Sequence, residues 1–395
     1  MNSFGQDVVC FSHLRWGFVF QRPQHLMSRC AKRGRVFFIE EPVMEGDSAR
    51  LQCATCSQTG VHVVTPFFPR NTERESVPTR MRECLKDLFR QERIQDFVAW
   101  YYTPMAIEFT DELTPALTVY DCMDELSAFA HAPTGMLANE NKLFQQANLV
   151  FTGGLSLYEA KCSQHPDVHL FPSSVDRAHF ARAMESIDEP PDQSSVPHPR
   201  IGYAGVIDER MDLDLLAFLA DSRPEWHIVL LGPVVKINVD DIPSRPNIHL
   251  LGKKPYEELP AYLSGWDVAL LPFAQNDATR FISPTKTPEY LAADLPVVST
   301  PIRDVERPYG KLGLVSIGRT HREFLEAVEQ QLLDGRPAEW RTEVDSFLRA
   351  LSWDKTWAEM ERLICRDLDR SQRESVQEQT APLPIAKRRV SVAHV

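Results

Sequence analysis

The sequence has no stretch that would mark a membrane-spanning or secreted chain. Among its 395 residues, no apolar run approaches the roughly 20 residues that a transmembrane helix needs. Residues 1–7 have neither the basic start nor the apolar core of a signal peptide. We therefore expect a cytoplasmic protein.

An excess of positive charge is also lacking. The 43 Lys and Arg residues stand against 55 Asp and Glu, a formal net charge of −12. This balance argues against a general nucleic-acid binder but leaves room for a local basic pocket. Two nucleotide-binding motifs are missing as well. Neither G-x-x-x-x-G-K-[ST] of P-loop enzymes nor G-x-G-x-x-G of nicotinamide dehydrogenases occurs.

Patterns typical of metal ligands are few. Of the eight cysteines, only Cys53 and Cys56 form a C-x-x-C pair, whereas a zinc site needs about four ligands. The D-x-D patterns at residues 212–214 and 367–369 lie at expected helix ends rather than after a strand. We therefore expect free thiols and no metal site.

What the sequence does contain is a regular alternation of short apolar runs with amphipathic stretches. Its composition, 43% hydrophobic and 25% charged, is that of a globular protein, and its length suits two α/β domains. Because the apolar runs are continuous, they indicate strands buried on both faces of parallel sheets. We predict an α/β fold with two Rossmann-like domains that face each other across a cleft. The predicted units are a domain at 1–185, a proline-rich linker at 186–199, a domain at 200–350, a helix at 351–370 that packs back across the domains, and a disordered tail at 371–395.

The segment at residues 282–293 follows an apolar run and is predicted to form a loop and then a short helix. Its Thr285, Lys286 and Thr287 bring hydroxyls, an ammonium and free backbone N–H groups to the helix start, which suits a phosphate or diphosphate. Glu289, one turn further on, would accept hydrogen bonds from sugar hydroxyls. The alternatives are that the threonines cap the helix and that Glu289 is an ordinary first-turn carboxylate.

Other strand ends of the second half add to this site. Gly205 lets a ligand approach the backbone closely, and Arg210 offers a planar, always-charged fork to a phosphate. Gly232 and Phe273 end two further apolar runs. The alternatives are turn chemistry for the glycines and a surface ion pair for Arg210. If Arg210 and Lys286 converge on one diphosphate, they would stabilise the charge that builds up as it leaves.

The first half offers a second set of polar side chains after predicted strands. His13, Arg15 and Trp16 follow the first strand, and Arg22 and His25 then lie three apart on one helix face. We expect them to line the cleft opposite the phosphate site. Trp16 would either stack on a sugar face or anchor the packing.

Two carboxylates, Asp121 and Asp124, end another strand of this half. In such a position a carboxylate can bind hydroxyl groups or accept a proton. The alternative is a helix start with ordinary acidic residues.

Taken together, these motifs resemble a known family. Residues 205–210, Lys286 and residues 289–299 look like the donor domain of GT-B fold glycosyltransferases, most similar to the retaining glycosyltransferase family four. Residues 16–25 and 120–125 are similar to a bacterial subgroup often met in cell-surface polysaccharide synthesis. Phe281 stands where the family has the first glutamate of its E-x₇-E motif, and Glu289 matches the second.

The resemblance implies a retaining, metal-independent transfer from a nucleotide-diphosphate sugar (a UDP- or GDP-sugar) to a hydroxyl of a glycan or lipid-linked acceptor, with no cofactor. The catalytic residues would be Arg210, Lys286 and Asp121, of which the first two hold the diphosphate. The donor-binding residues would be Gly205, Gly232, Phe273, Thr285, Thr287 and Glu289, with Glu289 on the ribose. The acceptor-side residues would be His13, Arg15, Trp16, Arg22, His25 and Asp124.

Two other functions fit the same architecture. A nucleotide-sugar epimerase would use Asp121, Asp124 and His25 as its acid–base set. A non-catalytic sugar-nucleotide-binding protein would have no need of the glutamate that Phe281 replaces. Peripheral association with the inner face of the cell membrane is a further expectation, because acceptors in such pathways are often lipid-linked.

Overall fold

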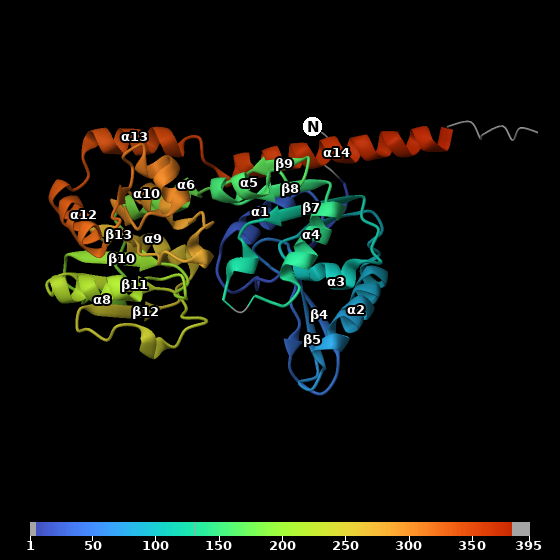
Figure 1. The fold of residues 1–395 in the computed structure, drawn as a ribbon, viewed down its shortest axis with the longest axis horizontal. Coiled ribbons are helices and arrows are strands. Elements are labelled where there is room, and N and C mark those ends of the chain that lie inside the picture. The colour runs from blue at the N-terminus through green and yellow to red at the C-terminus, as the bar shows by residue number, and fades with distance from the viewer. Residues whose placement is uncertain (1–4, 131, 381–395) are drawn as a thin grey trace, which may run out of the picture.

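Two lobes stand side by side in the computed structural model, which describes residues 5–130 and 132–380 (Figure 1). The N-terminal sheet has nine strands: β1 (Asp7–Ser12), β2 (Val36–Glu40), β3 (Val43–Met44), β4 (Arg50–Thr55), β5 (His62–Phe68), β6 (Phe97–Tyr101), β7 (Leu117–Cys122), β8 (Leu149–Thr152) and β9 (Val168–Leu170). The C-terminal sheet has six: β10 (Arg200–Ala204), β11 (His227–Leu231), β12 (Ile248–Gly252), β13 (Val268–Leu271), β14 (Val297–Ser299) and β15 (Ser316–Ile317).

The apolar runs form strands that are buried on both faces. In β1, Val8 and Cys10 belong to one core cluster, and Val9 and Phe11 belong to the cluster on the opposite face of the sheet. Successive side chains of a strand point to opposite faces, so a strand between two helical layers must be apolar at every position. This is why continuous apolar runs predict the sheets correctly.

The order of the strands in each sheet indicates where a ligand would bind. The two sheets contain the equivalent parallel orders β5-β2-β1-β6-β7-β8 and β12-β11-β10-β13-β14-β15. In each, the order reverses beside the first strand, and ligands of open α/β sheets bind outside the carboxyl ends of the strands at such a reversal. The loops after β1 and β6, and those after β10 and β13, are therefore the expected walls of a cleft. The predicted α/β architecture with two Rossmann-like lobes is confirmed.

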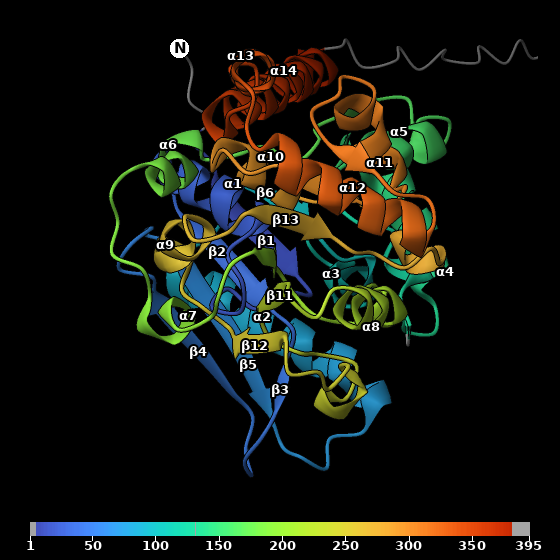
Figure 2. The ribbon, with the colours of Figure 1, turned by 90° about the vertical axis from the view of Figure 1, so that its left-hand side faces the viewer.

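The helices cover both sheets (Figures 1 and 2). Those of the N-terminal lobe are α1 (Arg22–Cys30), α2 (Val77–Glu92), α3 (Ile107–Thr110), α4 (Met136–Gln146) and α5 (Leu155–Lys161). Those of the C-terminal lobe are α6 (Arg177–Ala181), α7 (Pro191–Ser194), α8 (Leu213–Ser222), α9 (Leu259–Leu263), α10 (Lys286–Ala292), α11 (Arg303–Val305), α12 (His321–Asp334) and α13 (Ala338–Leu348).

The chain passes between the lobes earlier than the proline-rich segment suggests. Helix α6 already belongs to the C-terminal lobe, because Phe180 is part of that lobe's core. The segment at 186–199 lies on the same lobe. Its Gln193 is fully buried, accepts a hydrogen bond from Trp266 Nε1 at 2.9 Å and donates one to the Tyr262 carbonyl at 2.9 Å.

The last helix, α14 (Trp353–Thr380), returns to the N-terminal lobe, over which it lies in Figure 1. One apolar face of it enters a core cluster of that lobe, through Trp353, Trp357, Met360, Leu363, Ile364 and Leu368. The helix continues ten residues beyond 370, where the sequence predicts that order ends. Gln and Glu, which make up half of residues 371–380, are good helix formers. The rest of the predicted tail, 381–395, lies outside the described residues. In the described part of the chain, no helix is long and apolar enough to cross a membrane.

Candidate active site

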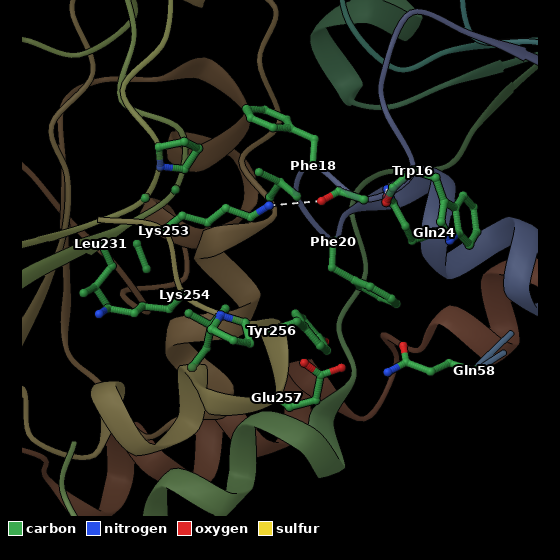
Figure 3. A pocket seen from close by; sticks show the side chains of 18 of the residues that line it. Trp16, Phe18, Phe20, Gln24, Gln58, Leu231, Lys253, Lys254, Tyr256 and Glu257 are labelled. Atoms are coloured by element: carbon green, nitrogen blue, oxygen red, sulfur yellow. Dashed lines mark hydrogen bonds between the residues drawn. The ribbon is translucent and has the colours of Figure 1, made fainter. Parts of the chain in front are cut away.

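Three adjoining cavities lie between the lobes. The first, of about 610 Å³, is lined by residues 16–20, Cys56, Gln58 and Thr59 of the N-terminal lobe and by strand ends of the C-terminal lobe (Figure 3). The second, of about 120 Å³, shares Gly205 and Lys286 with the first. The third, of about 420 Å³, shares Asp124 and Arg210 with the second. The shared walls make one continuous cleft.

The second cavity brings together the two cations that the sequence singles out. Arg210 follows β10 and Lys286 begins α10, and both line this cavity. Each is held by a carboxylate. Arg210 makes a fork-shaped ion pair with Asp208, with Nη2 at 2.7 Å from Oδ2, and Lys286 Nζ lies 2.7 Å from Oε2 of Glu289. The pairs fix both cations without filling the cavity, so a ligand could bind between them.

Glycines let the backbone approach this cleft. Gly205 and Gly232 both line the first cavity. At Gly232 the backbone has φ +146°, and a Cβ there would lie 1.7 Å from the Gly205 carbonyl oxygen. No other residue fits at this position without a shift of the backbone beside the cavity.

We expect Gly232→Ala to destabilise the fold by more than the roughly 1–3 kcal/mol of a strained backbone conformation, because a clash adds to the strain. Gly252→Ala is the matched control, since Gly252 also has a positive φ, +73°, but has no heavy atom within 4 Å of the position that a Cβ would occupy. Urea unfolding of both variants measures the difference. Equal losses would contradict a close approach at Gly232.

The other predicted donor-binding residues divide into two groups. Thr285 and Phe273 line the second cavity. Thr285 forms no side-chain cap bond, so the capping alternative is wrong for it. Thr287 is fully buried and lines none of the three cavities, so it faces the protein interior. Helix α10 has only seven residues, so a phosphate site here depends on side-chain cations rather than on the helix dipole.

Glu289 does not line the cleft directly. It is 4% exposed, and burial raises its pKa while Lys286 opposes that effect. Its reach into the cleft is through Lys286, whose ammonium it holds. A ribose contact would require the carboxylate to exchange this partner for a sugar hydroxyl.

The loop after β1 forms the N-terminal wall of the first cavity, and Figure 3 shows it opposite Lys253 and Tyr256. Lys253 Nζ donates to the Gly17 carbonyl at 3.0 Å, and the rings of Phe20 and Tyr256 stack with centroids 4.5 Å apart. Trp16 lines the cavity while its ring packs edge-on against Phe38 at 5.0 Å, so it is both wall and anchor.

Asp121, one of the three predicted catalytic residues, does not line the cleft. It is fully buried and lines none of the three cavities. Its carboxylate accepts hydrogen bonds from Nε and Nη2 of Arg22 at 3.0 and 2.8 Å, while Arg22 Nη1 donates to the Phe171 carbonyl at 2.7 Å. Arg22 does line the second cavity. Asp121 therefore fixes the position of the Arg22 guanidinium and does not itself reach the cleft.

His25 and Arg15 line none of the three cavities, although the His25 ring contacts the cavity-wall rings of Phe20 and Tyr256 at 4.7 and 5.8 Å. His25 is 4% exposed, its ring stacks on Trp353 with centroids 4.6 Å apart, and burial lowers its pKa well below the usual value. Arg15 instead ties its loop to the end of β2, through Glu40 Oε2 at 3.1 Å and the Glu41 carbonyl at 2.5 Å. Arg15 therefore packs within the N-terminal lobe, whereas His25 lies behind the aromatic wall of the first cavity.

Besides Trp16 and Arg22, two further acceptor-side candidates line the cleft. His13 lines the third cavity, and burial lowers its pKa to about 4, so the ring is neutral at pH 7. Asp124 lines the second and third cavities. Burial raises its pKa to about 6, although Arg210 and Arg22 attract its charge. Asp124 is the only aspartate or glutamate that lines the second cavity in the described chain.

We expect Asp124→Asn to be more stable than the wild type at pH 7.5. The folded-state pKa of Asp124, about 6, lies above the unfolded value, so the folded protein binds this proton more tightly. The wild-type free energy of unfolding therefore falls as pH rises from about 4 to 6, and the charged carboxylate costs stability above that range. The gain from asparagine should shrink as the pH falls to 4.5. Urea unfolding at both pH values tests this, and an equal gain at both would contradict it.

The metal-binding alternatives gain no support. Within residues 5–130 and 132–380, no group of three or more His, Cys, Asp or Glu is placed to hold a metal ion. Cys53 and Cys56, the C-x-x-C pair, are free thiols. Asp212, in one of the D-x-D patterns, caps α8 by accepting from the Leu215 N–H at 2.8 Å.

Residues 198–334 match the family model described as "Glycosyl transferases group 1". A relative from Bacillus subtilis (strain 168), named for teichuronic acid biosynthesis as the glycosyltransferase TuaH, is 22% identical over 213 residues, which are 48% of this chain. The chain spans about half of that relative's length, 53%.

Solved structures are similar over nearly the whole chain. Sucrose-phosphate synthase from Thermosynechococcus elongatus has a TM-score of 0.67 at 13% identity, covering 91% of this chain and 98% of its own. An Escherichia coli trehalose-6-phosphate protein bound with UDP-2-fluoro glucose has a TM-score of 0.64 at 12% identity, covering 92% of this chain and 99% of its own. Anabaena Alr3699/HepE in complex with UDP has a TM-score of 0.61 at 11% identity, covering 91% of this chain and 100% of its own.

At these identities the structural likeness shows the fold, and the family model shows the class of the C-terminal lobe. The chain has the GT-B fold, and residues 198–334 match the glycosyl transferases group 1 model, which supports the predicted enzyme class, a glycosyltransferase.

Proposed function

We propose that the protein transfers a sugar from a nucleotide-diphosphate sugar to a hydroxyl of a glycan or lipid-linked acceptor, with retention of configuration and without a metal ion. The observation that carries the proposal is the convergence of Arg210 and Lys286 on one small cavity, from loops that follow different strands of the C-terminal sheet. Two cations whose side chains are only 23% and 13% exposed suit a leaving diphosphate.

The neighbouring first cavity is the place for the nucleoside. Its volume, about 610 Å³, lies within the usual range for small-molecule sites. Gly205 and Gly232 let the ligand approach the backbone there, and Tyr256 and Phe20 supply aromatic surface. Because two structural neighbours were solved with UDP or UDP-2-fluoro glucose, UDP-sugars are the first donors to test.

In the proposed reaction the bond between the anomeric carbon and the diphosphate oxygen breaks, and a bond to the acceptor oxygen forms on the same face of the sugar. The leaving oxygen takes the acceptor proton, so the reaction needs no protein base. Arg210 and Lys286 stabilise the charge that develops on the diphosphate. Arg22, fixed by Asp121, adds a third cation to this wall.

A nucleotide screen followed by a transfer assay tests the proposal. A nucleoside diphosphate that binds the folded state should increase the free energy of unfolding, by about 2.7 kcal/mol at a ligand concentration of 100 Kd. The melting temperature should rise accordingly. The matching nucleotide sugar should then be consumed with an acceptor, and NMR of the product should show the anomeric configuration of the donor. An inverted product would contradict retention, and no shift with any nucleoside diphosphate would contradict the donor class.

Removal of divalent metals should leave turnover within about twofold of the untreated rate, because two or three side-chain cations take the charge-neutralising role that a metal ion serves in other enzymes. The measurement is initial rate after exhaustive dialysis against EDTA, with and without added Mg²⁺ or Mn²⁺. Loss of activity that Mn²⁺ restores would contradict metal independence.

The alternative functions have less support. An epimerase would need a convergent acid–base set, but of Asp121, Asp124 and His25 only Asp124 lines the cleft. Incubation with donor alone distinguishes the two, because only an epimerase would form the epimer. Tight donor binding without transfer to any acceptor would favour the non-catalytic alternative.

The cellular role that we favour is synthesis of a cell-surface polysaccharide on the cytoplasmic side of the membrane. The support is the similarity, over about half of each chain, to a relative named for teichuronic acid biosynthesis. Loss of a surface polysaccharide in a deletion strain, restored by the wild type but not by Lys286→Ala, would support this role.

A further inference from the structure

The third cavity differs from the other two in the chemistry of its wall. Much of its surface comes from apolar side chains of the N-terminal lobe, namely Leu14, Met105, Met123, Leu126, Phe129 and Met136. Polar residues also line it, and three of them, Gln21, Asp124 and Arg210, are shared with the second cavity. The other polar residues that line it are His13, Glu41, Thr103, Asp208 and Lys236, so the cavity is amphipathic.

Its position makes it the entrance for the second substrate. If the nucleoside fills the first cavity and the diphosphate lies at Arg210 and Lys286, the sugar attached to the diphosphate lies where the second and third cavities meet. The first and third cavities have only Phe18 in common within the described chain. The hydroxyl that attacks the sugar therefore has to come from a molecule in the third cavity.

The polar residues of this cavity can bind hydroxyls, but a sugar ring would be a poor occupant of the part lined by the six apolar side chains. Each hydroxyl buried there without a hydrogen-bond partner costs free energy. An apolar group gains about 0.8 kcal/mol for each CH₂ that it buries. Three of the six apolar residues are methionines, whose flexible thioethers adapt to ligands of varied shape.

The wall is also coupled to the diphosphate site. The ring of Phe129, from the N-terminal lobe, lies 5.4 Å from the guanidinium carbon of Arg210 and 4.6 Å from Lys236 Nζ, both of the C-terminal lobe. These cation–π contacts hold the ring between the apolar wall and the cation that receives the diphosphate.

We propose that the acceptor carries a compact apolar group, aryl or alkyl, directly beside the hydroxyl that is glycosylated, and that this group occupies the third cavity. The inference rests on the proposed function and narrows its acceptor. The apolar group packs on Met105, Leu126 and Met136, and the hydroxyl lies toward Asp124 and Arg210.

The test uses the full chain saturated with the nucleoside diphosphate that stabilises it most. Octyl β-glucoside below its micelle concentration, 4-nitrophenyl β-glucoside and glucose are titrated in parallel, with binding followed by calorimetry. We expect both glucosides to bind at least 10-fold more tightly than glucose. The octyl and nitrophenyl arms distinguish an alkyl from an aryl preference.

A pair of variants locates the effect. Leu126→Gln places an amide on the cavity wall and should reduce the advantage of the glucosides over glucose at least fivefold. Leu137→Gln is the matched control, because Leu137 is 60% exposed, lies beside Met136 in the sequence and does not line the cavity. The control should keep the wild-type advantage.

Equal affinity for glucose and both glucosides would overturn the acceptor inference, as would an undiminished advantage in Leu126→Gln. Failure to bind any nucleoside diphosphate is a separate result that would overturn the proposed function itself.

Discussion

Replacing Lys286 or Arg210 with alanine should lower kcat/KM for sugar transfer by about 10²-fold or more, the usual loss when one pre-positioned charge stabiliser is removed. Both side chains line the second cavity, where the proposed diphosphate would develop negative charge. Initial rates over a range of donor concentrations measure the effect. If the loss is in kcat rather than in KM, the interaction is made mainly in the transition state.

The control is Arg280→Ala. Arg280 is an exposed cation of the same loop as Lys286, rests on the Phe281 ring at 5.1 Å and lines none of the three cavities. It should keep close to wild-type activity. Arg210→Ala also leaves the buried Asp208 without its partner and should lower stability. Arg210→Lys keeps a positive charge beside Asp208, and a melting curve of each variant shows whether a loss of activity is due to unfolding. Wild-type rates in both alanine variants would contradict the diphosphate site.

Replacing Asp121 with alanine should cost about 3–5 kcal/mol of unfolding free energy, because it leaves the buried Arg22 guanidinium without its carboxylate. The side chains of Asp121 and Arg22 are 0% and 3% exposed and are joined by a forked pair of hydrogen bonds. Urea unfolding measures the loss. A double-mutant cycle with Arg22→Met should show coupling, because removal of both charges costs less than the sum of the single losses.

The matched comparison is a surface pair of the same charge types. Glu359 and Arg362 are 51% and 60% exposed, and Glu359→Ala should cost less than about 1 kcal/mol. If Asp121→Ala costs as little as Glu359→Ala, the buried pair does not anchor Arg22. If Asp121→Ala is stable but inactive, Asp121 takes part in the chemistry and its role as a positioning residue is wrong.

How much of the fold the sequence predicts depends on burial. The apolar runs at 36–40 and 149–152 coincide with β2 and β8, which are buried along their whole length. The sequence does not predict strand β4. Its side chains are mostly exposed and it pairs antiparallel with β5, so no apolar run marks it.

The site residues follow the same logic. Arg210 and Lys286 can be predicted, because strand-end position is encoded in local sequence. The sequence does not predict that Tyr256 lines the cleft, and it wrongly predicts that His25 does. In both cases the ring that stacks on the residue is distant in sequence: Phe20 for Tyr256 and Trp353 for His25. Phe281, which replaces a family glutamate, packs against a core cluster of the N-terminal lobe, a contact between lobes that no local pattern reveals.

The central claim is that Arg210 and Lys286 together bind a diphosphate, as a diphosphate clamp. Its most direct test compares a nucleoside diphosphate with the monophosphate of the same base by titration calorimetry. In the wild type, the diphosphate should bind at least 10-fold more tightly, and this preference should collapse in Lys286→Ala and Arg210→Ala but persist in Arg280→Ala. Equal affinities for the two nucleotides in the wild type, or a preference that survives both alanine substitutions, would contradict a diphosphate clamp at this site.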